Sequence, residues 1–144
     1  MNDNCIFCKL AAGEIPRHAI YEDGEFLVFL DAFPSSLGHT LIIPKAHHEN
    51  IFDITEDTAA KLQRLVVRTA NALRDVLGTS DINILQNNGK SAGQTVFHYH
   101  VHLIPRADGD NVRIGWSTAK PSAEECAAFA SNVAAGYSHT ETGA

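Results

Sequence analysis

The sequence lacks the features that mark membrane-spanning and exported proteins. Its 144 residues, 44% of them hydrophobic, contain no uninterrupted apolar run of the ~18 residues that a transmembrane helix needs. Residues 1–4 carry neither the basic start nor the apolar stretch of a secretory signal peptide. We therefore expect a single cytoplasmic domain with no membrane partner and with enough chain to bury a core.

Clusters of lysine and arginine are also missing. The chain has 11 basic and 17 acidic residues and a formal net charge of −6. Because affinity for long polyanions depends on many basic contacts, this composition argues against nucleic acid as a partner. A small phosphorylated ligand is compatible with it, since backbone N–H groups, amides and imidazoles can hold phosphate without a basic patch.

Cysteine is scarce and odd in number, at Cys5, Cys8 and Cys126. An odd count in a chain without an export signal argues against a disulfide framework. Cys5 and Cys8 form a Cys-x-x-Cys pair, which the residues alone leave open to three interpretations: two small buried residues, a redox pair, or half of a zinc site. Cys126 is expected to be a buried small residue on a helix.

Histidine, in contrast, is concentrated in residues 93–105. His98, His100 and His102 alternate with large residues, which predicts a β-strand that ends at Pro105 and carries the three imidazoles on one face. The core face of this strand would carry the intervening Phe97, Tyr99, Val101 and Leu103. From the residues alone, the run is a solvent-facing strip, a metal site, or a site where one imidazole acts as a nucleophile.

Apolar periodicity predicts the other elements. Residues 55–77 repeat apolar positions at intervals of three and four, between a Thr55 N-cap and Gly78, and predict one long helix that covers a sheet. Short helices are expected at residues 5–12 and, from a capping box, at about 122–135. Short apolar runs predict further strands at residues 19–22, 26–30, 39–44 and 81–86.

The stretch from His98 to Ile104 resembles the His-φ-His-φ-His-φ-φ motif of the histidine triad (HIT) family, in particular its zinc-containing bacterial Hit-like and Hint-like members. Residues 38–45 resemble a second block of that family. The resemblance implies an α+β, HIT-like fold with an antiparallel five-stranded sheet, one long helix and short terminal helices, assembled as a homodimer. We expect one domain over residues 1–144, with its core at about 5–106.

The resemblance also implies an enzyme: a nucleotide hydrolase or transferase acting on AMP-containing purine nucleotides. His100 would attack the α-phosphorus of a nucleoside phosphoramidate or a dinucleoside polyphosphate, forming a covalent nucleotidyl-histidine intermediate. His102 would assist with charge or the leaving-group proton. His98 is the third catalytic candidate, unless a metal takes its ring nitrogen.

Family spacing further implies a structural Zn²⁺ held by Cys5, Cys8, His47 and His98, with His48 the less favoured alternative to His47. The chemical step itself would need no metal. The resemblance implies an apolar slot for the base, lined by Ile6, Phe7, Leu10, Phe29 and Ala32. It gives phosphate contacts to Asn87, Gly93, Gln94 and Thr95.

Asp31 follows an expected strand, and by itself it reads as an ordinary loop cap. In the family an acidic residue at this place holds the ribose hydroxyls, which suits a carboxylate acceptor. Two other functions are kept as alternatives. One is a zinc-dependent hydrolase in which the three histidines hold a catalytic ion, and the other is a nucleotide-binding sensor without turnover.

Overall fold

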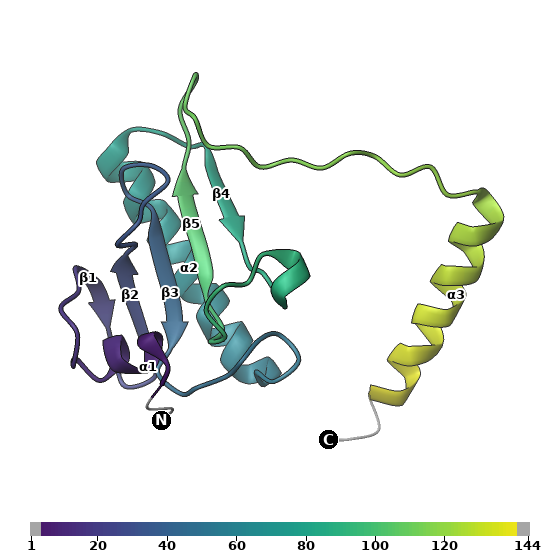
Figure 1. The fold of residues 1–144 in the computed structure, drawn as a ribbon, viewed down its shortest axis with the longest axis horizontal. Coiled ribbons are helices and arrows are strands. Elements are labelled where there is room, and N and C mark those ends of the chain that lie inside the picture. The colour runs from purple at the N-terminus through teal and green to yellow at the C-terminus, as the bar shows by residue number, and fades with distance from the viewer. Residues whose placement is uncertain (1–3, 141–144) are drawn as a thin grey trace. The chain divides into compact units, whose positions relative to one another are not determined.

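The computed structural model describes residues 4–140, which form two compact units that divide between Val112 and Arg113. The expected single domain over residues 1–144 stays a prediction. None of the helices in the described part is long and apolar enough to cross a bilayer. In chain order the elements are α1 (Ile6–Ala11), β1 (Ala19–Glu22), β2 (Phe26–Leu30), β3 (Thr40–Pro44), α2 (Glu56–Leu77), β4 (Ile82–Leu85), η1 (Lys90–Ala92), β5 (Val101–Pro105) and α3 (Ala123–Thr140) (Figure 1).

The strands of the first unit form one five-stranded antiparallel sheet in the order β1-β2-β3-β5-β4, which confirms the expected fold. The strand that is last in the chain lies between β3 and β4. His102 of β5 therefore pairs with Leu41 on one side and with Leu85 on the other. This insertion brings the end of the histidine run to the middle of the sheet.

The long helix forms as the periodicity predicts. The Thr55 hydroxyl accepts a hydrogen bond from the Thr58 N–H at 3.2 Å, and Gly78 ends α2 with a φ of 69° that glycine adopts without strain. The buried face of α2 packs on one face of the sheet. That core contains Phe26, Val28, Ile42, Leu62, Leu65, Val66, Leu73, Tyr99, Val101 and Leu103.

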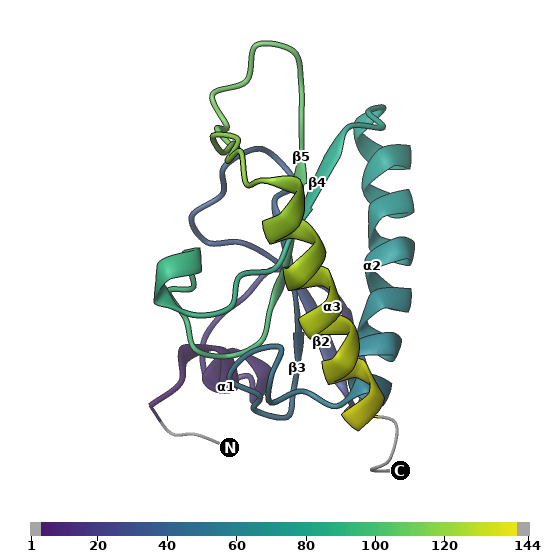
Figure 2. The ribbon, with the colours of Figure 1, turned by 90° about the vertical axis from the view of Figure 1, so that its right-hand side faces the viewer.

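The other face of the sheet meets α1. Figure 2 shows the strands with α2 along one side and α1 on the opposite side. Because side chains alternate along a strand, the neighbours of the α2-facing residues point to α1. They form a second, smaller core of Cys5, Phe7, Cys8, Leu10, Leu27, Phe29, Leu41 and Ile43.

The histidine strand is shorter than the alternation predicts. β5 begins at Val101, so His98 and His100 precede it, and Phe97 is 44% exposed instead of packing in the core. The reason lies in backbone partners outside the sheet, since the Tyr99 N–H donates to the carbonyl of His48, in the loop after β3, at 2.6 Å. The expected strand is therefore wrong for residues 97–100, and only its part from Val101 to Pro105 forms.

The second unit contains α3, which begins with the expected capping box. The Ser122 hydroxyl accepts from the Glu125 N–H at 3.1 Å, and the Glu125 carboxylate accepts from the Ser122 N–H at 2.7 Å. The helix continues to Thr140, beyond the predicted end near residue 135. Cys126 is exposed on α3, so the prediction that it is buried is wrong.

Candidate active site and metal centre

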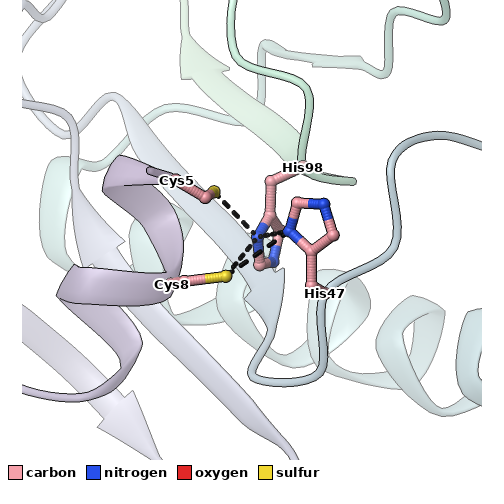
Figure 3. Close-up of side chains that lie close together, drawn as sticks. All are labelled: Cys5, Cys8, His47 and His98. Carbon is pink, nitrogen blue, oxygen red and sulfur yellow. Dashed lines mark hydrogen bonds between the residues drawn. The ribbon is translucent and has the colours of Figure 1, made fainter. Parts of the chain in front are cut away.

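Four side chains from three separate segments converge beside α1. Cys5 and Cys8 come from the start of α1, His47 from the loop after β3, and His98 from the segment before β5 (Figure 3). The Nδ1 atom of His98 lies 3.4 Å from Cys5 Sγ, 3.6 Å from Cys8 Sγ and 3.3 Å from His47 Nδ1. Cys8 Sγ lies 3.4 Å from His47 Nδ1. The structure thus brings together all four residues predicted to hold zinc.

These separations fit a tetrahedral ion better than a hydrogen-bond network. Three neighbours surround the single Nδ1 atom of His98, and only one proton can lie between them. Zinc with Zn–N bonds of ~2.0 Å and Zn–S bonds of ~2.3 Å holds two nitrogens ~3.3 Å apart and a nitrogen and a sulfur ~3.5 Å apart. The observed atoms already have this spacing, so the donor set fits a structural zinc.

The His98 ring has the tautomer that a metal ligand needs. Its Nε2 lies 2.8 Å from the Pro44 carbonyl oxygen, which can only accept, so the proton is on Nε2 and Nδ1 offers its lone pair. Burial lowers the pKa of His98 to about 4, which keeps the ring neutral at pH 7. With both nitrogens engaged, the His98 ring has no atom left for a substrate.

His48 is not part of this cluster. Its Nδ1 lies 3.2 Å from the backbone oxygen of Asp53, away from the cysteines. The geometry therefore supports His47 over His48 as the fourth ligand.

His100 is buried beside the metal cluster. Its Nδ1 lies 2.6 Å from the His98 carbonyl oxygen, so Nδ1 carries the proton and Nε2 has a free lone pair. The Phe7 ring packs edge-on at 5.1 Å from the His100 ring. Burial lowers the pKa of His100, which favours the neutral form. The arrangement provides an uncharged imidazole with one nitrogen available as a nucleophile.

A second chain of hydrogen bonds orients His102. The Ser35 N–H donates to Nδ1 of His39 at 3.0 Å, which leaves the proton of a neutral His39 on Nε2. That Nε2 lies 2.9 Å from Nδ1 of His102, so His102 accepts there and carries its own proton on Nε2. Burial lowers the pKa of both rings, that of His102 to about 4. His102 thus presents an N–H where His100 presents a lone pair.

The two remaining nitrogens face open space. Among the described residues, Arg17 Nε is the one fully buried side-chain polar atom without a partner. The Nε2 atoms of His100 and His102 have no hydrogen-bond partner in that part of the chain, so they must reach solvent. Their rings lie 4.9 Å apart, centroid to centroid.

Asp31 lies at the edge of this site. Its Oδ1 accepts from the Phe33 N–H at 2.8 Å, and its Oδ2 lies 3.5 Å from His39 Nε2. Asp31, His39 and His102 also form a second group with the spacing of possible metal ligands. From the sequence, His39 could equally lie near the triad or be a packed strand histidine, and its signal was its place in the block of residues 38–45 that resembles the family.

The predicted base slot is only partly an open surface. Phe7, Leu10 and Phe29 are buried in the core under α1, with the Phe7 and Phe29 rings edge-on at 6.0 Å. Ile6 is half exposed and Ala32 is exposed. The slot would therefore use the rim of this core, with Ile6 as its accessible apolar side chain.

The predicted phosphate loop differs in one residue. Gln94 is buried, and its amide accepts from the Gly89 N–H and donates to the carbonyls of Glu49 and Val96. This corrects the expected phosphate contact of its side chain, which has no donor left. Thr95 is exposed, and Asn87 is half-buried next to Gly93. Gly93 has a φ of 89°, a conformation that favours glycine.

Known proteins share both the sequence and the fold. Protein hit of Bacillus subtilis is 47% identical over 117 residues, which cover 81% of each chain. Adenosine 5'-monophosphoramidase hnt1 of Schizosaccharomyces pombe is 36% identical over 131 residues, which cover 90% of this chain and 96% of the relative. Adenylylsulfatase HINT3 of Arabidopsis thaliana is 40% identical over 76% of this chain and 56% of its own length.

Solved structures agree. A HIT family protein from Bacillus anthracis superposes with a TM-score of 0.88 at 40% identity, covering 94% of this chain and 99% of its own. A zinc-bound histidine triad family protein from Mycobacterium smegmatis superposes with a TM-score of 0.73 at 39% identity, covering 92% and 97%. The family model described as the HIT domain matches residues 12–109. This chain therefore belongs to the HIT domain family.

Proposed function

We propose that this protein is a nucleotide hydrolase or transferase that acts at the α-phosphate of adenylated substrates. The observation that carries the proposal is the pairing of tautomers, in which His100 offers a lone pair and His102 an N–H, both at Nε2. A nucleophile next to a hydrogen-bond donor is what phosphoryl attack requires. The names of two relatives, a monophosphoramidase and an adenylylsulfatase, agree with cleavage next to an adenylate.

In the proposed reaction, Nε2 of His100 attacks the α-phosphorus, and the bond from phosphorus to the leaving group breaks. The leaving group departs with the electron pair and takes up a proton from solvent. Water then attacks the nucleotidyl-imidazole, the P–N bond breaks, and AMP is released. One proton of that water returns to solvent, and the ring regains its lone pair. Throughout, the His98 carbonyl holds the Nδ1 proton, and the positive charge that forms on the ring is stabilised there.

Within this proposal the residues around the histidines bind the nucleotide. Asp31 would accept hydrogen bonds from the ribose hydroxyls, and Ile6 would contact the base. The phosphate would meet the loop that contains Asn87, Gly93 and Thr95. The zinc would hold Cys5, Cys8, His47 and His98 in place and would not take part in the chemical step.

The test compares wild type with His100→Ala and, as a matched control, with His18→Ala, an exposed histidine before β1. Each is incubated with adenosine phosphoramidate, adenylyl sulfate and diadenosine polyphosphates, and AMP release is followed. Loss of the nucleophile should lower kcat by at least ~10³-fold. Wild type quenched in alkaline denaturant, in which a P–N bond to histidine survives, should carry an adenylate on residue 100, and the variant should not. Turnover retained in His100→Ala would disprove the covalent mechanism.

The same experiment separates the alternatives. A nucleotide sensor would bind AMP without releasing product from any of the substrates. A hydrolase with a catalytic ion would lose activity with a chelator while its fold survives, and the Asp31, His39 and His102 group is the place for such an ion. The three triad rings do not surround a common point, because the His98 ring faces Cys5 and Cys8.

We also propose a homodimer joined through the open edge of the sheet. β4 is an edge strand, and Ile84 on it and Val67 on α2 are both about half exposed. A groove of about 380 Å³ between these elements is lined by both residues. An unpaired apolar edge is a site for joining a second sheet. Ile84→Lys should convert a dimer to a monomer in sedimentation, and a wild-type monomer would disprove the proposal.

A further inference from the structure

The metal cluster and the nucleophile share one residue. The ring of His98 belongs to the cluster through Nδ1, while its backbone oxygen accepts the Nδ1 proton of His100 at 2.6 Å. The ring is also fixed by Nε2, which donates to Pro44 at 2.8 Å. Any movement of the His98 ring that changes its backbone therefore changes the bond that sets the tautomer of His100.

The sheet does not hold this region in place. The pairing of β3 with β5 covers Val101 to Leu103, and both His98 and His100 lie before it. The segment is anchored by the Tyr99 N–H bond to the loop after β3, by the Tyr99 side chain in the core under α2, and by the contacts of the His98 side chain. A bound ion would add a further constraint, because it would tie His98 to two other segments.

A second contact runs through α1. Phe7 lies between the two cysteines, and its ring packs edge-on against His98 at 5.9 Å and against His100 at 5.1 Å. α1 has six residues and no side-chain N-cap bond, so it has little stability of its own. Its position depends on packing and on what Cys5 and Cys8 bind.

We infer that metal occupancy of the Cys5, Cys8, His47 and His98 cluster positions the nucleophile, because it holds the His98 carbonyl and the Phe7 ring against His100. The donor set of two thiolates and two imidazoles is typical of zinc. His98 and Phe7 act as positioning residues. Without the ion, the atoms that converge on His98 Nδ1 cannot all be satisfied, α1 loosens, and the bond from His100 to the His98 carbonyl is no longer fixed.

The inference rests on the proposed function, but its primary test does not need turnover. Protein with ¹⁵N-labelled histidine is studied by long-range ¹H–¹⁵N spectra, which report the tautomer of each ring, and His100 is assigned by the signal missing in His100→Ala. Zinc-loaded wild type should show His100 only as the Nδ1–H form. After metal removal, the Nε2–H form should appear, and zinc should reverse the change.

Activity provides a second measurement. On metal removal kcat should fall at least ~10-fold, with a smaller change in KM, since misplacing a nucleophile affects the chemical step more than binding. Cys5→Ser should reproduce the metal-free spectra and kinetics, whereas Cys126→Ser, on the exposed face of α3, should leave both unchanged. Metal-free protein with one His100 tautomer and unchanged kcat would overturn the inference.

Replacing zinc with the larger Cd²⁺ covers the case in which metal-free protein unfolds. The exchanged protein keeps a ligated cluster, so its fold is retained while the cluster expands. The ring signals of both His98 and His100 should then shift, and kcat should change. A shift of the His98 ring signals without a shift of the His100 signals would overturn the proposed coupling between the cluster and the nucleophile. If zinc-loaded wild type turns over no adenylated substrate, the proposed function fails, and the His100 spectra still decide the coupling.

Discussion

The two ends of the histidine triad are held by different kinds of contact. At the His98 end, three nitrogen and sulfur neighbours lie 3.3–3.6 Å from one atom, a convergence that calls for an ion. At the His102 end, Ser35, His39 and His102 form a linear chain with bonds of 3.0 and 2.9 Å, each with one donor and one acceptor. The second arrangement is complete without a metal, although Asp31 is near enough to complete a ligand group.

This contrast indicates that the three histidine side chains have different roles. In the proposed site His98 would be a structural ligand, His102 is an oriented donor, and His100 between them receives its tautomer from the His98 backbone. The three histidines of one sequence motif therefore lie in three different environments. Changes at the His98 end or the His102 end of the triad test how far the two ends are independent.

The largest effect is expected from removing a metal ligand. His47→Ala should lose stoichiometric zinc and lower the Tm by more than ~10 °C, because the binding free energy of a structural zinc is also folding free energy. His48→Ala is the matched control, since its ring contacts Asp53 and not the cysteines, and it should keep one zinc per chain. Metal analysis with thermal unfolding measures both. Equal zinc in the two variants would mean that the ligand set is incorrect.

Acidification tests the His102 end of the triad. Burial, with smaller effects from His100 and His39, lowers the pKa of His102 to about 4, below the value of ~6.5 in an unfolded chain. Between these values the unfolded state binds more protons, so stability rises with pH; the contribution is complete above pH ~6.5 and is lost as the pH falls through about 4. For this one ring the loss is ~3 kcal/mol.

Denaturant unfolding at a series of pH values measures this slope. His102→Asn removes one titrating ring and should make the curve between pH 6.5 and 4 less steep than that of wild type, with the remaining slope from His98, His39 and His100. The same wild-type slope in the variant would show that other groups cause it. In activity profiles, the acid limb of kcat/KM should lie below pH ~6.5, because burial also lowers the pKa of His100.

Most of the fold could be predicted because it follows from local patterns. The residues of α2 repeat with helical period between a cap and a glycine, and β2 and β3 are short apolar runs, so each element is specified within its own sequence. The resemblance to a known family then supplied the assembly of the strands into one antiparallel five-stranded sheet. The four residues of the candidate metal cluster could be named because the resemblance to that family implied them.

The segment before β5 could not be predicted from its alternation. Its backbone and the Gln94 amide bond to His48 and Glu49, which are about 45 residues earlier in the chain. No pattern within residues 94–100 encodes these partners. The role of His39 could not be decided for a related reason, since its ring nitrogens bond to Ser35 and His102 and the residue itself precedes β3.

That residue gives the next prediction. His39→Phe keeps a ring at the position before β3 but removes the donor to His102, so the tautomer of His102 is no longer fixed, and kcat should fall ~100-fold. His39→Gln retains an amide N–H near the position of Nε2 and should recover part of the loss. Zinc content should be unchanged in both, because His39 belongs to the other end of the triad. Equal losses in the two variants would mean that His39 only fills space.

The smallest effect is expected from Asp31→Asn. The Asp31 carboxylate lies 3.5 Å from His39 Nε2, whereas His102 Nδ1 lies 2.9 Å from it, so the His39 proton is directed to His102. Removing the charge should leave kcat within ~2-fold and raise KM ~10-fold, the scale of one charged hydrogen bond to the ribose. Steady-state kinetics with ribose and 2'-deoxyribose substrates measures it, and the variant should no longer distinguish the two. A large fall in kcat with unchanged KM would instead make Asp31 part of the hydrogen-bond chain, and the two ends of the triad would then differ in charge as well as in donors.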